Sequence, residues 1–152
     1  MTKPRIVLLV GLPASGKSTW ARGQADGAVL SSDKIRGWLS DDVTNQKIHR
    51  RVFATLRHLL RQRLELGRPV TYVDSTSLTL KERRPYLAMG DLYDCEVEAV
   101  YFDIPLAVCL ERNRGRSRVV PEDAVREMAL RMVAPSVAEG FSRIRVIVIP
   151  KA

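Results

Sequence analysis

The residues of this chain best suited to chemistry lie in one glycine-rich stretch, Gly11-Leu12-Pro13-Ala14-Ser15-Gly16-Lys17-Ser18. Its spacing, G-x-x-x-x-G-K-S, lets backbone N–H groups curl around the phosphates of a nucleotide at the positive end of the following helix. Lys17 can reach the β- and γ-phosphate oxygens, and the Ser18 hydroxyl can ligate Mg²⁺. The stretch therefore predicts a phosphate-binding loop. Its predicted contacts are Gly11, Pro13, Ala14, Ser15, Gly16, Lys17, Ser18 and Thr19.

A candidate general base follows the second apolar run of the chain. Asp33 comes shortly after residues 28–31, and Arg36 lies one helical turn further on. A carboxylate at this place can face an incoming hydroxyl group. Arg36 can bind a phosphate of the acceptor, or it can pair with Asp33 and orient it. Asp41 and Asp42 are rival bases, but they lie further from a strand end and fit a solvated turn better.

Another acid, Asp74, ends the apolar run 70–74. An acid at the end of a buried strand beside a phosphate-binding loop can hold the hydration shell of Mg²⁺ or a neighbouring basic residue. The alternative is that Asp74 caps the turn that follows.

Four arginines crowd a short link between two predicted helices: Arg112, Arg114, Arg116 and Arg118. We call this link, residues 112–118, the lid. It can close over ATP and bring a guanidinium group to the transferring phosphate, or it can be a solvated charged loop.

Apolar runs at 5–10, 28–31, 70–74, 96–102 and 144–149 read as strands, and helical patterns separate them. This order predicts an α/β fold with a parallel five-stranded sheet, helices on both faces and ligands at the carboxyl ends of the strands. The simplest winding places strand 28–31 beside strand 5–10. A long amphipathic helix is expected from a cap at Thr44 to about Leu64, with basic residues on its other faces. The spacing of Thr79 and Glu82 predicts another helix cap.

Length and composition favour one domain over residues 1–152. The net charge of +8 favours a polyanionic partner over a neutral metabolite. Neither an apolar run long enough for a membrane nor a secretory signal is apparent, so a cytoplasmic protein is expected. Cys95 and Cys109 lack metal-binding spacing and are expected to be free thiols. His49 and His58 are expected at the surface or in a groove.

Five blocks of sequence resemble the kinase domain of polynucleotide 5′-hydroxyl kinases of the phage and bacterial end-healing type, which have a P-loop NTPase fold. They are the phosphate-binding loop with Thr-Trp-Ala, Ser-Asp-Lys-Ile-Arg at 32–36, Val-Asp-Ser-Thr at 73–76 with Glu-Arg-Arg at 82–84, Phe-Asp-Ile-Pro at 102–105, and Glu-Arg-Asn-Arg at 111–114 before Val-Pro at 120–121. The blocks keep the order of the family and extend over essentially the whole chain.

The resemblance implies transfer of the γ-phosphate of ATP to the 5′-hydroxyl of RNA or DNA. Lys17 and Ser18 would bind ATP and Mg²⁺, Asp33 would activate the hydroxyl, and Arg36 would contact the acceptor phosphate. From the lid, Arg112 and Arg116 would contact ATP. Asp74 and Thr76 match the family's Asp-Thr-Asn block, in which an amide stands at the position of Thr76. Phosphatase or ligase partners, common in the family, are not encoded here.

Two other functions stay open. The same scaffold serves kinases of small molecules such as nucleotides, sugar acids or antibiotics. A nucleic-acid-binding module that uses ATP without transferring phosphate is the other alternative, although the acid at position 33 argues against it.

Overall fold

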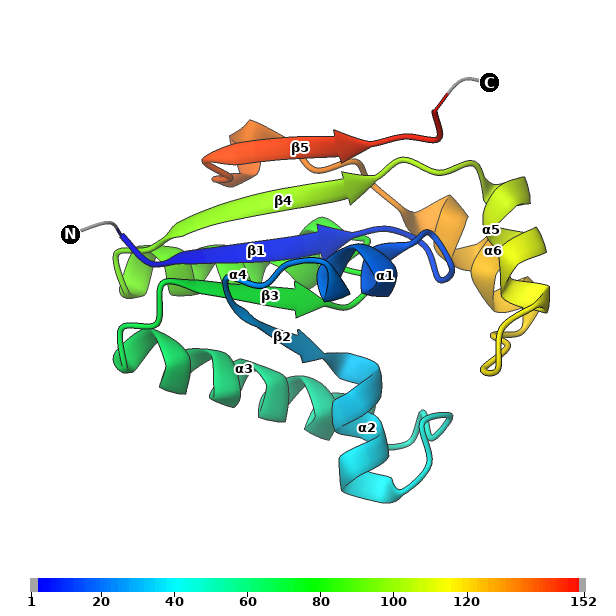
Figure 1. Ribbon diagram of the computed structural model, residues 1–152, viewed down its shortest axis with the longest axis horizontal. Coiled ribbons are helices and arrows are strands. Elements are labelled where there is room, and N and C mark those ends of the chain that lie inside the picture. The colour runs from blue at the N-terminus through cyan, green and yellow to red at the C-terminus, as the bar shows by residue number, and fades with distance from the viewer. Residues whose placement is uncertain (1–2, 151–152) are drawn as a thin grey trace.

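A computed structural model describes residues 3–150 and contains one parallel sheet of five strands, in the order β2-β3-β1-β4-β5 (Figure 1). The strands are β1 (Arg5–Val10), β2 (Ala28–Ser31), β3 (Val70–Asp74), β4 (Glu96–Phe102) and β5 (Arg143–Ile147). The helices are α1 (Lys17–Arg22), α2 (Ser32–Ser40), α3 (His49–Glu65), α4 (Leu80–Leu92), α5 (Leu106–Arg114) and α6 (Glu122–Arg131), with a 3₁₀ turn η1 (Val137–Glu139). The predicted α/β class and parallel sheet are confirmed.

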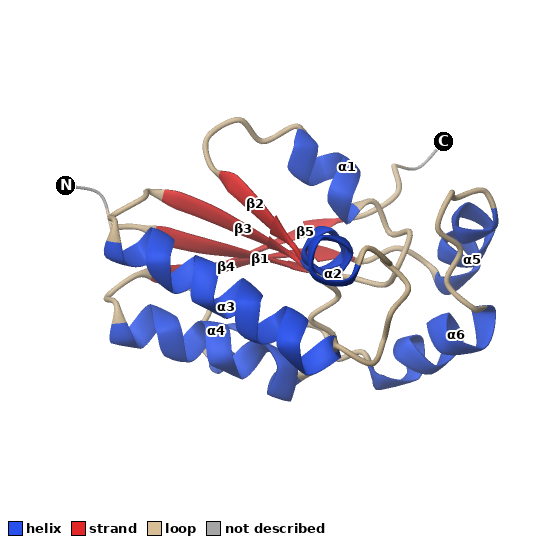
Figure 2. Ribbon diagram, turned by 90° about the horizontal axis from the view of Figure 1, so that it is seen from below, coloured by secondary structure: helices blue, strands red, loops and turns tan. Residues whose placement is uncertain are grey.

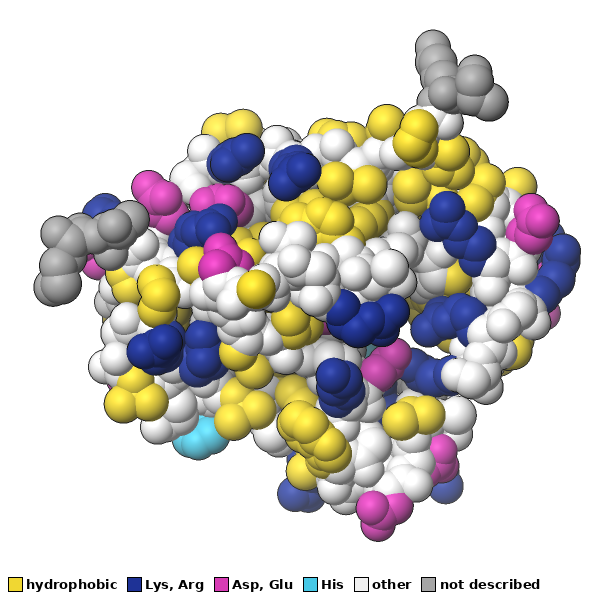
Figure 3. Space-filling view, in the orientation of Figure 1, with side chains coloured by type: hydrophobic (Ala, Val, Ile, Leu, Met, Phe, Trp, Pro, Cys, Tyr) yellow, Lys and Arg dark blue, Asp and Glu magenta, His cyan; other side chains and the backbone are white. Residues whose placement is uncertain are grey.

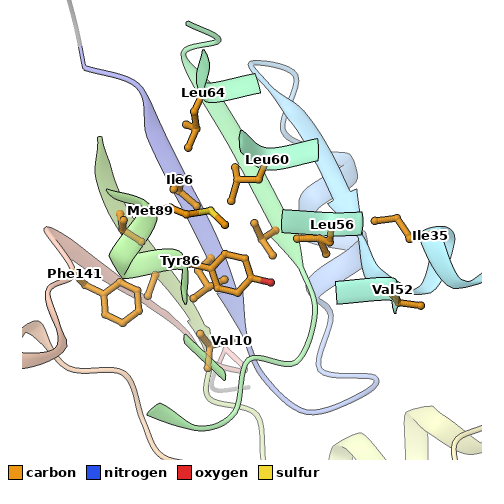
Figure 4. Close-up of a cluster of buried hydrophobic side chains, with 14 residues drawn as sticks. Ile6, Val10, Ile35, Val52, Leu56, Leu60, Leu64, Tyr86, Met89 and Phe141 are labelled. Atoms are coloured by element: carbon orange, nitrogen blue, oxygen red, sulfur yellow. The ribbon is translucent and has the colours of Figure 1, made fainter. Parts of the chain in front are cut away.

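Helices cover both faces of the sheet, as predicted. Figure 2 shows α3 and α4 on one face and α1 on the other, with α5 and α6 beyond the carboxyl ends of the strands. Alternate residues of β1 point to opposite faces, so Ile6 and Leu8 pack under α3 and α4 while Val7 and Leu9 pack under α1. The cluster between the sheet and helices α3 and α4 is the main core. Four buried residues of α3 point into it: Val52, Leu56, Leu60 and Leu64 (Figure 4). Both faces of β1 are buried, which explains its unbroken apolar run.

The expected neighbour of β1 was wrong. β3 lies between β1 and β2, and its register pairs Leu9 with Asp74 on one side and Asp74 with Ser31 on the other. After β1 and the phosphate-binding loop, the chain thus forms β2 one position away from β1, and β3 later occupies the position between them. Asp74, rather than the acid after β2, therefore ends the strand directly beside that loop.

The long helix begins later than predicted. The cap of α3 is Ile48 and not Thr44, because the carboxylate of Asp42 accepts hydrogen bonds from the backbone N–H and the hydroxyl of Thr44 and holds residues 42–44 in a turn. The preceding helix α2 ends at Ser40, close before this turn. Arg63 faces the sheet, where its guanidinium donates to Thr71 Oγ1 and to the Val70 carbonyl. It is therefore a structural residue and does not belong to the exposed basic surface of this helix.

Other expectations are confirmed. The Thr79 hydroxyl accepts the Glu82 N–H and caps α4, and both cysteines are free thiols. Within residues 3–150, none of the helices is long and apolar enough to cross a membrane.

A fully buried arginine connects α4 to the segment before β5. Arg83 forms an ion pair with Glu139 through Nε (2.8 Å) and Nη2 (3.1 Å), and its Nη1 donates to the carbonyls of Ser77 and Val133. All four contacts lie where water does not reach the guanidinium, which is 0% exposed. One side chain thereby joins residues 77–83 to residues 133–139, two segments that are far apart in the sequence.

Replacing Arg83 by Met should lower the free energy of unfolding by about 3 to 5 kcal/mol, because the Glu139 carboxylate and two carbonyls lose their partner. Urea denaturation measures the change. The adjacent exposed Arg84 provides the control, since R84M should cost less than about 0.5 kcal/mol. Equal stability of the two variants would contradict a structural role for the buried network.

Candidate active site

The phosphate-binding loop has a backbone that other residues could not easily adopt. Gly16 lies in the left-handed region with φ 102°, and a Cβ atom at Gly11 would lie 2.7 Å from Ser15 Oγ and 3.0 Å from Phe102 Cβ. The two glycines of the motif thus serve different purposes. Gly16 turns the chain into α1, and Gly11 lets the loop pass close to the end of β4.

Lys17 is the first residue of α1 and is almost completely buried. Its ammonium group donates to the carbonyls of Gly11 and Leu12, both at 2.8 Å. Burial lowers the pKa of Lys17 to about 8, and the charge of Asp74 opposes this effect only in part. The loop therefore holds a cation whose charge a bound phosphate would stabilise.

Asp74 contacts the first turn of α1. The Ser18 hydroxyl donates to Asp74 Oδ2 at 2.7 Å, and the carboxylate is itself buried. A hydroxyl and a carboxylate oxygen next to a phosphate-binding loop are suitable ligands for Mg²⁺, which prefers oxygen donors and retains several waters. These two residues fit a magnesium site completed by phosphate oxygens. The contact also favours the metal role of Asp74 over that of a turn cap.

Asp33 lies on the first turn of α2, whose N-terminus is capped by the hydroxyl of Ser31. Its Oδ1 faces two arginines: Nη1 of Arg36, from the next turn, at 3.4 Å, and Nη1 of Arg118, from the lid. Arg36 therefore does pair with Asp33. Burial lowers the pKa of Arg36, and its Nε is buried without a hydrogen-bond partner in the described part of the chain. This guanidinium retains a free donor.

The lid is held in shape by a buried asparagine. The Asn113 side chain donates to the Val120 carbonyl (2.6 Å) and accepts the Val120 N–H (3.0 Å). Within this closed loop Arg114 turns outward to Glu122, whereas Arg112, Arg116 and Arg118 face the phosphate-binding loop and α2. Nη1 of Arg116 is buried and finds no partner among residues 3–150.

A single cavity of about 1150 Å³ joins these groups. Figure 3 shows Lys and Arg side chains gathered around a hollow between the lid and the start of α2. The predicted site residues that line the cavity are Pro13, Ala14, Ser15, Gly16, Lys17, Ser18, Thr19, Asp33, Arg36, Asp74, Thr76, Arg112 and Arg116. Gly11, the first residue of the loop, does not line the cavity, and the rival acids Asp41 and Asp42 are exposed outside it.

The cavity wall also contains residues that the sequence did not assign to the site, among them Arg118, His49 and Phe53. Arg118 was grouped with the lid but not assigned to Asp33, and His49 and Phe53 of α3 were not assigned to the site. The arginine cluster itself was the only signal for Arg118. Both His49 and Phe53 fall within the predicted helix, but the amphipathic pattern does not show which face of that helix lies against the cavity.

The parallel sheet, the phosphate-binding loop after β1 and the lid beyond the strand ends together define a domain of the P-loop kinase type. A family model described as "AAA domain" matches residues 6–135, and the chain belongs to that family.

Two curated proteins are similar in sequence. A protein of Arabidopsis thaliana named transcription factor bHLH140 is 30% identical over 93% of this chain and 16% of its own length. The L-seryl-tRNA(Sec) kinase of Methanococcus maripaludis is 25% identical over 81% of this chain and 50% of its own length. This chain thus spans at most half of either relative.

Three solved structures share the fold at low identity. A chain of the Pnkp1/Rnl/Hen1 RNA repair complex has a TM-score of 0.72 at 19% identity, over 86% of this chain and 44% of that one. Kti12 of Chaetomium thermophilum in complex with ADP-AlF3 has a TM-score of 0.66 at 16% identity, over 94% and 88%. A gluconokinase of Sinorhizobium meliloti has a TM-score of 0.64 at 15% identity, over 100% and 86%.

The pKa of Lys17 leads to a prediction for nucleotide binding. A triphosphate next to the ammonium group should raise this pKa from about 8, so binding above that pH takes up a proton and the affinity for ATP falls as the pH increases. Calorimetry at pH 8.5 in two buffers of different ionisation enthalpy measures the uptake. K17M should abolish it, and the exposed K81M should not. Binding without proton uptake by the unmodified protein would show that Lys17 is not the group that meets the phosphates.

Proposed function

We propose that this protein transfers the γ-phosphoryl group of ATP to the 5′-hydroxyl end of RNA or DNA. The observation that carries the proposal is the position of Asp33. This carboxylate lines the same cavity as the phosphate-binding loop and is flanked by two guanidinium groups that can accept an anionic acceptor. A base on one side and a triphosphate cradle on the other is the arrangement that phosphoryl transfer to a hydroxyl needs.

In the proposed step, the acceptor hydroxyl oxygen forms a bond to the γ-phosphorus and the bond from that phosphorus to the β,γ-bridging oxygen breaks. ADP leaves with the bridging oxygen, and the hydroxyl proton passes to Asp33. Arg118 forms an ion pair with this carboxylate, so its side chain must move aside before the hydroxyl can reach Asp33. Lys17 and Arg116 stabilise charge on the transferring group, and Arg112 approaches the loop, with Nη1 3.9 Å from the Cβ position of Gly16.

Ser18 and Asp74 would hold Mg²⁺, which neutralises charge on the β- and γ-phosphates when bound. The separate position of Asp33, on α2 rather than on β3, leaves it available for the acceptor. Thr76 also lines the cavity and can contribute a hydroxyl to acceptor binding, at the position where the polynucleotide 5′-hydroxyl kinases have an amide.

A polynucleotide acceptor fits the charge of the protein. The net charge of +8 exceeds what one nucleotide requires, and Arg36 keeps a buried donor free for a phosphate. The exposed basic residues at the start of α3, Arg50 and Arg51, extend this charge beyond the cavity. The RNA repair complex and the seryl-tRNA kinase among the similar proteins support an acceptor that contains RNA. Phosphatase or ligase partners would come from other chains or domains.

The rival acceptor is a small hydroxylated molecule. The gluconokinase fold extends over this entire chain, and the same base and cradle could phosphorylate a sugar acid. The two acceptors differ in size and charge, so they differ in their response to salt. Binding of an oligonucleotide releases counterions and weakens steeply as salt increases, whereas a small acceptor shows a shallow dependence.

The experiment that tests the proposal mixes the protein with γ-labelled ATP and Mg²⁺ and offers 5′-hydroxyl RNA, 5′-hydroxyl DNA, gluconate and nucleosides in separate reactions. We expect label on the oligonucleotide ends, with a KM that rises with salt. Label on gluconate alone would establish the small-molecule alternative. Binding of ATP and oligonucleotide without labelled product would establish a binding module.

Asp33→Asn should reduce transfer about 10²- to 10⁴-fold, because the amide cannot accept the hydroxyl proton, while ATP binding changes little. Initial rates with labelled ATP and a nucleotide-binding assay measure the two effects. D41N is the matched control, because Asp41 ends the same helix outside the cavity and Asn tolerates its left-handed backbone. Undiminished transfer by D33N would remove Asp33 from the role of base.

A further inference from the structure

Two aromatic side chains line the acceptor end of the cavity without a role in the proposed step. They are His49 and Phe53, one turn apart at the start of α3, and their ring centroids are 4.7 Å apart with an interplanar angle of 49°. Phe53 also packs against the main core, which fixes its ring in place. Figure 4 shows Val52 and Leu56 of the same helix pointing into that core, so Phe53 occupies the adjacent face of α3.

These rings continue the wall that begins at the candidate base. Asp33 contacts Arg36, and Nη2 of Arg36 lies 3.4 Å from Nδ1 of His49. Burial, with the Arg36 charge second, lowers the pKa of His49, so the ring is mostly neutral at pH 7. A neutral Nδ1 can accept the Arg36 hydrogen bond and keep the imidazole beside Phe53. The wall therefore runs from a carboxylate through a guanidinium to two aromatic side chains.

The same order of groups occurs along a nucleotide at the 5′ end of a strand. Its 5′-hydroxyl comes first, its 3′-phosphate and its base follow, and the base is planar. Aromatic side chains stack on any base, since every base has a π face. The Phe53 ring has no donor or acceptor, so it offers nothing to the hydroxyls of a sugar acid.

We propose that His49 and Phe53 form a platform on which the 5′-terminal base of the acceptor stacks, next to the phosphate contact of Arg36. This inference rests on the proposed function and narrows it, because it makes the acceptor a nucleoside end rather than a small polyol. Stacking accepts all bases, so the platform recognises the presence of a base and not its identity.

The test compares a 5′-hydroxyl oligonucleotide with an otherwise identical one whose 5′-terminal residue is abasic. With the unmodified protein, we expect a KM about 5- to 100-fold higher for the abasic acceptor, and an unchanged KM for ATP. F53A should raise the KM for the normal acceptor by a similar factor and leave that for the abasic acceptor unchanged, since the two losses remove one contact. F53W should preserve the difference between the acceptors.

L59A is the control, because Leu59 lies on the same helix and packs against the same core outside the cavity. It should leave the ratio of the two KM values as it is in the unmodified protein. If the unmodified protein phosphorylates both acceptors equally well, the platform is refuted whatever the variants do. The same holds if F53A weakens both acceptors alike. Failure of the unmodified protein to phosphorylate either oligonucleotide would instead refute the proposed function.

Discussion

An imbalance of charge inside one cavity governs this structure. Its walls carry two carboxylates, Asp33 and Asp74, against five cations: Lys17, Arg36, Arg112, Arg116 and Arg118. Burial makes this excess expensive, as the lowered pKa values of Lys17 and Arg36 show. A polyanion that enters the cavity relieves the repulsion and supplies acceptors for buried donors. The excess positive charge thus causes repulsion among the cationic side chains and favours the binding of a phosphorylated ligand.

The order of strands determines which groups meet in that cavity. β1 lies at the centre, with β3 on one side and β4 on the other, so the chain leaves it in one direction first and passes to the other side later. In open α/β sheets, the crevice at such a reversal is where ligands bind. β3 puts Asp74 beside Ser18, while β2, one position further out, leads to the start of α2, from which Asp33 lines another part of the same cavity. One carboxylate therefore meets the first turn of α1, and the other stays with the guanidinium groups.

Much of this arrangement was readable in the sequence, and the failures have physical causes. Local signals identified the loop, the strands and the lid, because apolar runs and glycine spacing depend on neighbouring residues. Strand order depends on contacts between distant segments, so the position of β2 beside β1 was predicted wrongly. The start of α3 was misplaced because Asp42 captures the Thr44 hydroxyl, a choice between two local hydrogen bonds that residue type does not settle. Arg118 and Phe53 could not be assigned because no sequence pattern records which loop faces which helix.

The two hydrogen bonds between Asn113 and Val120 restrict the conformation of the lid. Because both edges of that loop are joined by two hydrogen bonds, the segment between them is a closed ring and cannot unfurl residue by residue. The two inward arginines within this ring, Arg116 and Arg118, are therefore held in a fixed relation to each other, whereas Arg112 lies on α5 outside it. Contact between these two guanidinium groups and a phosphorylated ligand would therefore cost little conformational entropy, because the loop that carries them is already ordered.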